Sequence, residues 1–410
     1  MNRINFQVAL TLLLAFCLCK RVQSQNKSVN KIPIIVITDL YHPAQDPGDN
    51  FDLLMAYALP QIDLKAVILD CTEPFRQHIA VNPGEGLYPD SNGPREAGYI
   101  PMLQLNYIFD RSVPFAAGPF YPMKNENDKM PDIPKFQQQG IELLIKTLKE
   151  SPVKIQILSF GSARILAVAY NREPALFKKK VERIHLSAGA AGPDFLEWNV
   201  ALDRVAIKTI LHSKLPVALY PCAADTANGI GYGSYNYPFS YDEHNSFYKL
   251  PNLNFIFKMD TVLQCYLAYS FKQSMQNDFL RAMENDTVLN MVPGYYNHEH
   301  YLWETAVWLQ VAKMKLVYTK AKKYSIIPEN KVAASDKIIT NELHPCKVKL
   351  CSNGYTFQQT KQPSNFSIFY RNNPLLYEKA MQQALPDLYV GFKAALKNRY
   401  DGNTSNVEMR

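Results

Sequence analysis

Four carboxylates crowd one short stretch of the chain. Asp39, Asp46, Asp49 and Asp52 lie within the run TDLYHPAQDPGDNFD, which has apolar segments on either side. Like charges this close repel one another, and burying them is costly unless a cation lies between them. A metal ion bound by clustered carboxylate oxygens would supply that charge. The stretch therefore predicts either a metal site or an acidic turn that caps the following helix.

The segments around this stretch alternate between strand and helix patterns. IPIIVI reads as a buried strand, FDLLMAYAL has a helical apolar period, and LKAVIL reads as a second strand. Further strands are expected in VPFAAG, KIQILSF, VERIHLS and LPVALYP, with helices between them. This alternation predicts an α/β fold with an open, mostly parallel sheet and helices on both faces. Ligands of such sheets collect outside the carboxyl ends of the strands, where Asp39 is expected to lie.

Three parts of the chain are expected. Residues 1–24 have a basic start, an apolar core and a cleavage site after Ser24, which together predict a signal peptide. Residues 32–330 are expected to form the α/β domain, in which YLWETAVWLQVAKMKL reads as a helix. Residues 331–410 are expected to form a small C-terminal extension with a hairpin at HPCKVKLCSNGYTF and a terminal helix.

The signal peptide predicts a secreted, extracellular glycoprotein. The spacing in CKVKLC is short enough for a disulfide between Cys346 and Cys351 within the hairpin, whereas Cys71 and Cys222 lie in apolar runs typical of buried thiols. Glycosylation sequons, which require surface positions in a secretory compartment, begin at Asn26, Asn285, Asn365 and Asn403.

Charge and hydropathy narrow the range of partners. The net charge of +7 is spread along 410 residues, and the basic runs are typical of the solvent-exposed faces of helices. No nucleic-acid partner is therefore expected. No segment after the signal peptide approaches the roughly 18 apolar residues of a membrane span, so no membrane association is expected. The sequence is compatible with a homo-oligomer.

Four blocks, in order from about Ile32 to Lys315, resemble the nucleoside hydrolase superfamily of calcium-dependent N-ribohydrolases. DPGDNFD is similar to the family loop D-P-G-x-D-D, and KIQILSFGSARILAVAYN is similar to its strand, G-P-L-T-N turn and helix. NVALDRVAIKTILHS resembles its N-x-x-x-D-P-x-A helix, and YLWETAVWLQVA resembles the segment that returns the last metal-binding carboxylate. The resemblance implies the fold of this family, a bound Ca²⁺ and hydrolysis of an N-glycosidic bond.

The resemblance also implies roles for individual residues. Asp46 matches the carboxylate that binds the metal and takes a proton from the attacking water. The run DNFD stands where the family has adjacent aspartates, so the second ligand is either Asp49 or Asp52. Glu304 matches the distal metal ligand, although on an apolar helix it could instead be a surface or ion-paired residue.

The substrate-binding residues are expected from two other blocks. Asn199 stands where the family places a side-chain amide that grips the ribose hydroxyls, and a simple helix N-cap is the alternative. Trp303 precedes Glu304 and is placed to stack on the leaving base. His300 matches a position from which some members protonate that base, although aromatic residues at such spacing often belong to the core.

Two functions follow from these residues. The first is a secreted, calcium-dependent hydrolase of N-glycosidic, nucleoside-type bonds in which Asp46 is the general base. The second is a catalytically reduced relative that acts as a secreted sugar-binding, calcium-binding or extracellular-matrix protein. Both would bind a small nucleoside or sugar ligand, so turnover of nucleosides discriminates between them.

Overall fold

The computed structural model describes residues 31–42, 44, 47–72, 96–192, 195–223, 242–271, 278–284 and 296–396. Met1–Lys31 and Ile32–Arg410 are separate compact units, and the fold below is that of the second unit. The expected signal peptide lies outside the described residues. None of the helices in the described ranges is both long and apolar enough to cross a bilayer.

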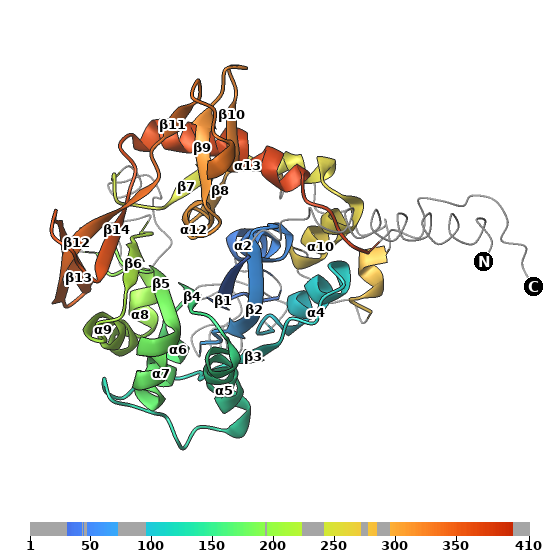
Figure 1. Cartoon of the computed structure of the whole chain (residues 1–410). Helices are drawn as coiled ribbons and strands as arrows, with labels where there is room; N and C mark the ends of the chain where they lie inside the picture. Colours follow the sequence, from blue (N-terminus) through green and yellow to red (C-terminus); the bar gives the residue numbers. More distant parts are fainter. Residues whose placement is uncertain are drawn as a thin grey trace, which may run out of the picture. The chain divides into compact units, whose positions relative to one another are not determined.

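A nine-stranded sheet runs through this unit in the order β13-β12-β14-β6-β5-β4-β1-β2-β3 (Figure 1). Its first six strands along the chain all run parallel and correspond to the six strands expected before the C-terminal hairpin. They are β1 (Ile32–Thr38), β2 (Ile62–Leu69), β3 (Phe115–Ala117), β4 (Ile155–Phe160), β5 (Val181–Ser187) and β6 (Val217–Tyr220). Strands β1, β2 and β3 lie side by side toward one edge of the sheet. The chain then returns past β1, and β4, β5 and β6 follow on its other side. This order is that of a doubly wound fold, with its reversal point between β1 and β4.

Strand β1 shows why these residues form a central strand. Ile34, Ile35, Val36 and Ile37 are all fully buried, because both faces of a parallel sheet are covered. Successive side chains point to opposite faces, so Ile34 and Val36 belong to one core and Ile35 and Ile37 to the other. The unbroken apolar run therefore predicts a strand buried on both sides.

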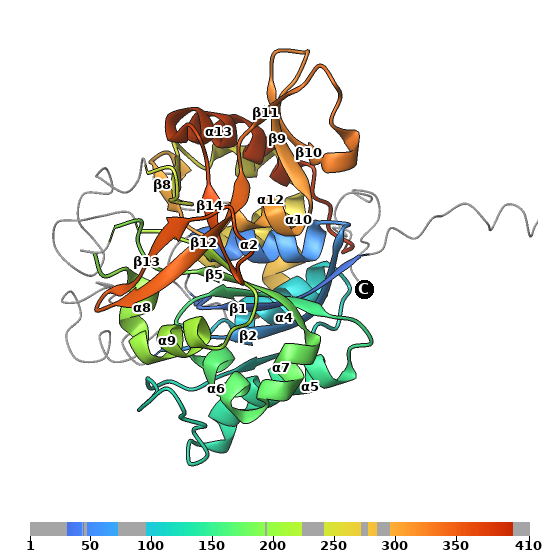
Figure 2. The same ribbon diagram turned by 60° about the vertical axis from the view of Figure 1, so that its left-hand side comes forward.

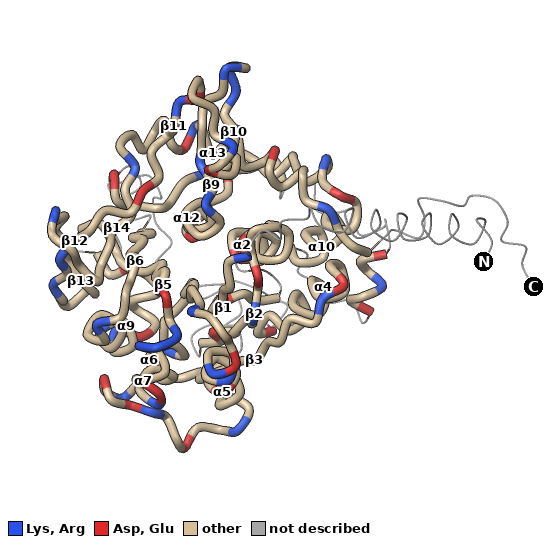
Figure 3. The backbone as a smooth tube through the Cα atoms, viewed as in Figure 1, with Lys and Arg blue, Asp and Glu red and all other residues tan. Residues whose placement is uncertain are grey.

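Helices cover both faces of the sheet, as expected (Figure 2). The core containing Ile34 also contains side chains of α2 (Pro47–Ala58), α4 (Tyr99–Ile108), α10 (Thr261–Phe271), α12 (Val307–Val311) and α13 (Pro374–Val390). The core containing Ile35 includes side chains of α5 (Lys135–Glu150), α6 (Arg164–Arg172), α7 (Pro174–Lys180), α8 (Trp198–Leu202) and α9 (Arg204–His212). Basic and acidic residues alternate over the tube instead of gathering in one run (Figure 3).

The described residues 331–396 do not form a separate extension. Strand β14 (Phe366–Tyr370) pairs in parallel with β6, β12 (Glu342–Cys351) pairs antiparallel with β14, and β13 (Gly354–Gln359) forms the outer edge. Two small sheets complete the described strands: β10 (Tyr324–Pro328), β9 (Met314–Tyr318) and β11 (Lys337–Ile339), and β7 (Tyr248–Leu250) with β8 (His300–Leu302). The boundary expected at residue 330 is therefore wrong, since the segment beyond it completes the main sheet and its helix α13 lies on the core.

The disulfide expected between Cys346 and Cys351 is also wrong. Both residues lie on the single strand β12 and are free thiols. Five residues of strand span about 16 Å, whereas the Cα atoms of a disulfide lie within about 7 Å of each other. The hairpin itself is formed by β12 and β13. The two cysteines are close in sequence because both lie on the first strand of this hairpin, not because they face each other across it. Cys71 and Cys222 are buried thiols, as expected.

Candidate functional site

The carboxyl ends of β1, β2 and β4 meet where the strand order reverses. Asp70 follows β2, and its backbone N–H donates to the Thr38 carbonyl at 2.8 Å. The backbone N–H of Asp39 donates to the Phe160 carbonyl at the end of β4, at 3.3 Å. Asp39 and Asp70 are both buried. Two carboxylates therefore lie at the edge of the sheet where doubly wound folds bind their ligands.

Helix α2 brings two more carboxylates to this edge. Asp49 lies in its first turn, three residues before Asp52, and both are buried. The Asp49 Oδ1 accepts a long hydrogen bond from the Thr38 hydroxyl at 3.5 Å, and the Asp52 Oδ1 accepts one from the Trp308 indole N–H at 3.0 Å. Asp46, the expected general base, lies outside the described residues.

Glu304 lies in the turn between β8 and α12, so only Val307–Val311 of the helix expected over residues 301–316 is helical. Burial raises the pKa of the Tyr248 phenol most, and the nearby carboxylates of Asp52 and Glu304 raise it further. Glu304 also raises the pKa of the Cys222 thiol at the end of β6, after burial and Glu197. Asp52 and Glu304, far apart in the sequence, therefore both influence the pKa of the same phenol.

These carboxylates are the type of ligand that calcium prefers, but those in the described residues are too few to form a complete site. Carboxylate oxygens are the hard donors that Ca²⁺ prefers, and three of them come from the strand end and the first turns of α2. In the described part of the chain, however, no group of three or more His, Cys, Asp or Glu side chains is arranged to hold a metal ion. A complete ligand set would require Asp46.

The expected substrate-binding residues have different environments. Asn199 is buried on α8 at the end of β5, and its side-chain N–H donates to the Ser187 carbonyl at 3.0 Å. The N-cap of α8 is Glu197, not Asn199. Trp303 is half-buried, with its ring 5.8 Å from that of Phe247. His300 is buried at the start of β8, so of the two expected base contacts Trp303 is the more accessible.

Ser246 fixes the backbone of this segment to the sheet. Its hydroxyl donates to the Trp303 carbonyl at 2.8 Å, and its backbone N–H donates to the Pro221 carbonyl at 2.7 Å. Pro221 directly follows β6. Trp303 and the adjacent Glu304 are thereby held at the same edge of the sheet as the strand ends.

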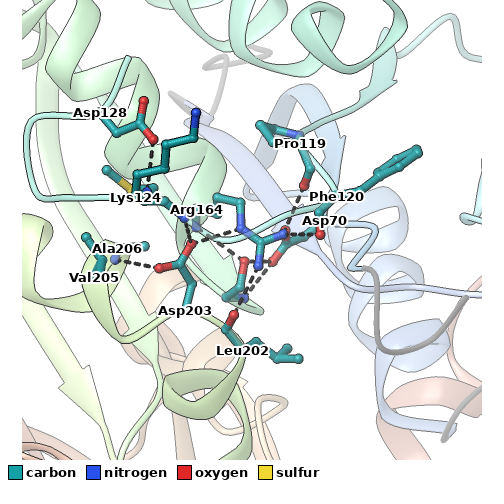
Figure 4. A network of polar contacts seen from close by, with 12 residues as sticks. Asp70, Pro119, Phe120, Lys124, Asp128, Arg164, Leu202, Asp203, Val205 and Ala206 are labelled. Atoms are coloured by element: carbon teal, nitrogen blue, oxygen red, sulfur yellow. Dashed lines mark hydrogen bonds and ion pairs between the residues drawn. The ribbon is translucent and has the colours of Figure 1, made fainter. Parts of the chain in front are cut away.

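A buried ion pair beneath this edge was not expected from the sequence. The Arg164 Nε lies 2.9 Å from the Asp203 Oδ2, and both side chains are at most 1% exposed (Figure 4). Asp203 also caps α9 by accepting the Ala206 N–H at 3.0 Å, which breaks the helix expected over residues 199–213 into α8 and α9. The remaining guanidinium N–H groups donate to the carbonyls of Pro119, Phe120 and Leu202.

Asp70 lies beside this pair. Its Oδ2 accepts hydrogen bonds from the backbone N–H and hydroxyl of Ser162, at 2.5 and 2.7 Å. A Cβ at residue 161 would lie 2.5 Å from the same oxygen, so Gly161 permits this close approach. One sequence signal could have identified Asp70. It directly follows the predicted strand β2, just as Asp39 directly follows β1.

We expect Asp70 to make stability depend on pH. Burial raises its pKa, while Arg164 and the Ser162 hydrogen bonds oppose that rise less strongly. The folded state therefore holds the Asp70 proton more tightly than the unfolded chain, so its contribution is greatest below the usual pKa of 3.8 and falls as pH rises through the folded value. Asp70→Asn has no proton to lose, so its unfolding free energy relative to wild type should increase from acidic to neutral pH. Urea unfolding at several pH values measures this difference, and a difference that does not change with pH would contradict the expectation.

Three of the expected glycosylation sites, Asn26, Asn285 and Asn403, lie outside the described residues. Asn365 is exposed, immediately before β14, and its side-chain N–H donates to the Leu215 carbonyl at 3.1 Å. The exposed position is compatible with a glycan, and glycosylation stays a prediction.

Comparison with known proteins gives one group of relatives. No family model matches the chain. The pyrimidine-specific ribonucleoside hydrolase RihA of Citrobacter koseri is 28% identical over 185 residues, which cover 42% of this chain and 57% of the relative. RihA of Escherichia coli O1:K1 / APEC matches with the same identity and coverage. The chain thus spans somewhat more than half the length of the curated relatives it matches.

Solved structures of similar proteins cover more of the chain at lower identity. A plant nucleoside hydrolase, PpNRh1, is 13% identical, covering 86% of this chain and 98% of its own, with a TM-score of 0.46. The purine-preferring ribonucleoside hydrolase of Gardnerella vaginalis is 12% identical, covering 87% and 99%, with a TM-score of 0.44.

The fold and the site define a class: doubly wound α/β proteins with buried carboxylates at the carboxyl edge of the sheet. The sequence matches add a likeness to one family. The chain is similar, at 28% identity over 42% of its length, to ribonucleoside hydrolases.

Proposed function

We propose that this protein hydrolyses the N-glycosidic bond of a nucleoside-type substrate at the carboxyl edge of β1 and β4. The observation that carries the proposal is the position of Asp49 and Asp52, buried in the first turns of α2, with Glu304 in the turn after β8 that Ser246 holds at the same edge of the sheet. Curated relatives that match the chain are ribonucleoside hydrolases by name.

Members of the superfamily typically bind Ca²⁺, and the residues that would hold it here are Asp46, Glu304 and at least one of Asp49 and Asp52. Bound calcium would lower the pKa of a coordinated water and so supply a nucleophile near neutral pH. Asp46 accepts the proton of the attacking water.

The other residues position the two halves of the substrate. The Asn199 side-chain N–H donates to the Ser187 carbonyl, and its Oδ1 is the amide atom we assign to a sugar hydroxyl. Trp303 offers an aromatic face for the leaving base, and Ser246 fixes its backbone. His300 is buried, so Trp303 is assigned the main contact with the base and His300 a supporting one.

The test is release of free base from inosine, uridine, adenosine and guanosine by the purified chain with calcium present. We expect release from at least one nucleoside, with one molecule of free ribose per base. Calcium bound without any release would instead favour the second function, a secreted sugar-binding, calcium-binding or matrix protein.

We also propose that the protein is exported and extracellular, on the strength of the basic start and apolar core of residues 1–24. N-terminal sequencing of material secreted by expressing cells should give a chain that begins after Ser24. A secreted chain that still begins at Met1, or retention of all the protein inside the cell, would contradict this localisation.

A further inference from the structure

Basic side chains collect at the amino-terminal edge of the main sheet, opposite the edge that carries the acidic cluster. Lys154 directly precedes β4, and Lys178 to Lys180 form the last turn of α7, directly before β5. Arg183 lies on β5, and Lys214 lies shortly before β6. Three short segments that are separate in the sequence therefore bring cations to one edge.

Strand pairing places these segments side by side. Strands β4, β5 and β6 are adjacent and parallel. Ile155 and Val181, the first residues of β4 and β5, are paired, so the preceding Lys154 and Lys180 are neighbours. The pairing of β5 with β6 places Lys214 in the next row. Neighbouring strands lie about 4.8 Å apart, so the three strand starts span only about 10 Å.

These cations have few acidic partners. Glu150 and Glu173, the nearest carboxylates of the flanking helices, lie 3.9 Å from Lys146 and 2.8 Å from Lys149, so each already has a partner. Glu182 is exposed on β5 and offsets one positive charge. Five cations are exposed and form no ion pair within the described part of the chain: Lys154, Lys178, Lys179, Arg183 and Lys214. The edge therefore has an excess of positive charge that the described residues do not neutralise.

The composition of this surface favours one kind of polyanion. Single-stranded nucleic acids stack their bases on exposed aromatic rings, and membrane-binding helices insert apolar side chains. The rings of Tyr170 and Phe177, on α6 and α7, instead pack on each other at 5.9 Å, and Phe177 is fully buried. The Lys180 ammonium donates to the Ser151 carbonyl, which fixes the last turn of α7 beside the start of β4. Closely spaced cations without exposed rings match the repeated anionic groups of a heparin-like polymer.

We propose that the basic edge, formed by Lys154, Lys178, Lys179, Arg183 and Lys214, binds a sulfated, acidic polysaccharide. The choice of an extracellular polymer rests on the proposed export, whereas the proposed hydrolysis is not required. The basic edge lies at the amino ends of the strands and the acidic cluster at their carboxyl ends. The six residues of β4 separate the two by about 20 Å, so a bound polymer leaves the candidate active site open.

Fluorescence anisotropy of labelled heparin, titrated with the full chain at about 150 mM NaCl, tests the proposal. We expect wild type to bind heparin and not fully desulfated heparin. Lys178→Gln/Lys179→Gln and Lys154→Gln/Arg183→Gln should each weaken binding about tenfold. Each pair removes two ionic contacts, so the slope of log Kd against log salt concentration should also fall by about one to two.

Lys320→Gln/Lys322→Gln is the matched control. It removes the same charge from the exposed turn between β9 and β10, on the opposite side of this unit from α7 (Figures 1 and 2). Heparin binding should therefore remain as in wild type. Melting temperatures identify any variant that does not fold, and the single variant Lys179→Gln then gives a smaller effect of the same sign.

No heparin binding by folded wild type would overturn the proposal, and so would an equal weakening by the control variant. A loss confined to the α7 variant would overturn the assignment of one continuous surface. Tighter binding to a DNA duplex, or to vesicles with about 20% phosphatidylserine, would overturn the polysaccharide as the partner. Base release should be unchanged in both basic-edge variants, so failure of this proposal and failure of the proposed hydrolysis are distinguishable.

Discussion

Asp46→Asn should lower base release by about 10²- to 10⁴-fold, the usual cost of losing a general base. The amide that replaces the carboxylate can neither take the proton of the attacking water nor neutralise a calcium ion as well. Weakened calcium binding should therefore add to the loss at calcium concentrations that do not saturate the variant. Steady-state kinetics over a range of calcium concentrations separates the two effects, since saturating calcium restores binding but not proton transfer.

Asp52→Asn is the companion variant that tests charge without disturbing packing. The Asn Oδ1 can still accept the Trp308 indole N–H, which lies 3.0 Å from Asp52 in wild type, so the fold should remain intact. We expect weaker calcium binding and lower turnover at limiting calcium. Asp63→Asn is the control, because Asp63 is exposed on β2 and paired with Lys65 at 2.6 Å. Turnover of Asp46→Asn within a few-fold of wild type, at any calcium concentration, would remove Asp46 from its assigned role.

Arg164→Ala should destabilise the fold by about 3–5 kcal/mol, the usual effect of breaking a buried ion pair from one side. The substitution leaves the Asp203 carboxylate buried without the guanidinium 2.9 Å away, and it deprives three backbone carbonyls of their donors. Asp70 also loses the positive charge that opposes the rise in its pKa. Urea unfolding of the variant and wild type measures the difference in the free energy of unfolding.

An exposed ion pair provides the matched control for this prediction. Lys149 lies 2.8 Å from Glu173 with both side chains at least 40% exposed, so Lys149→Ala should cost at most about 1 kcal/mol. Arg164→Lys keeps the positive charge but loses the planar guanidinium donors. Its loss of unfolding free energy should therefore lie between those of Arg164→Ala and Lys149→Ala. This variant also permits the measurement if Arg164→Ala does not fold. A cost for Arg164→Ala no larger than for Lys149→Ala would contradict the structural role of the pair.

The parallel core of the fold could be read from the sequence because its signal is local. Ile34 to Ile37 form an unbroken apolar run, and a strand covered on both faces requires such a run. The place of β12 to β14 could not be read in this way. Phe366 pairs with Val217 across a separation of about 150 residues, and no local pattern specifies that partner.

The acidic stretch could also be recognised from the sequence because its signal is local: Asp49 and Asp52 are three residues apart on α2. Arg164 gives no such local signal, because its partner, Asp203, is 39 residues away and only the fold brings them together. Residues 301–316 were expected to be helical because short apolar runs in strands, turns and helices look alike. The structure places Glu304 in a turn there, next to Trp303, whose carbonyl accepts the Ser246 hydroxyl.

The most direct test of the proposed active site is base release from the best nucleoside substrate while free calcium is raised from chelator to saturation. If one calcium ion held by Asp46, Glu304 and an α2 carboxylate supplies the nucleophile, turnover should be absent in chelator and rise along a single-site saturation curve. Renewed chelation should abolish it again. Turnover that is indifferent to chelator, or no turnover at any calcium concentration, would contradict the account.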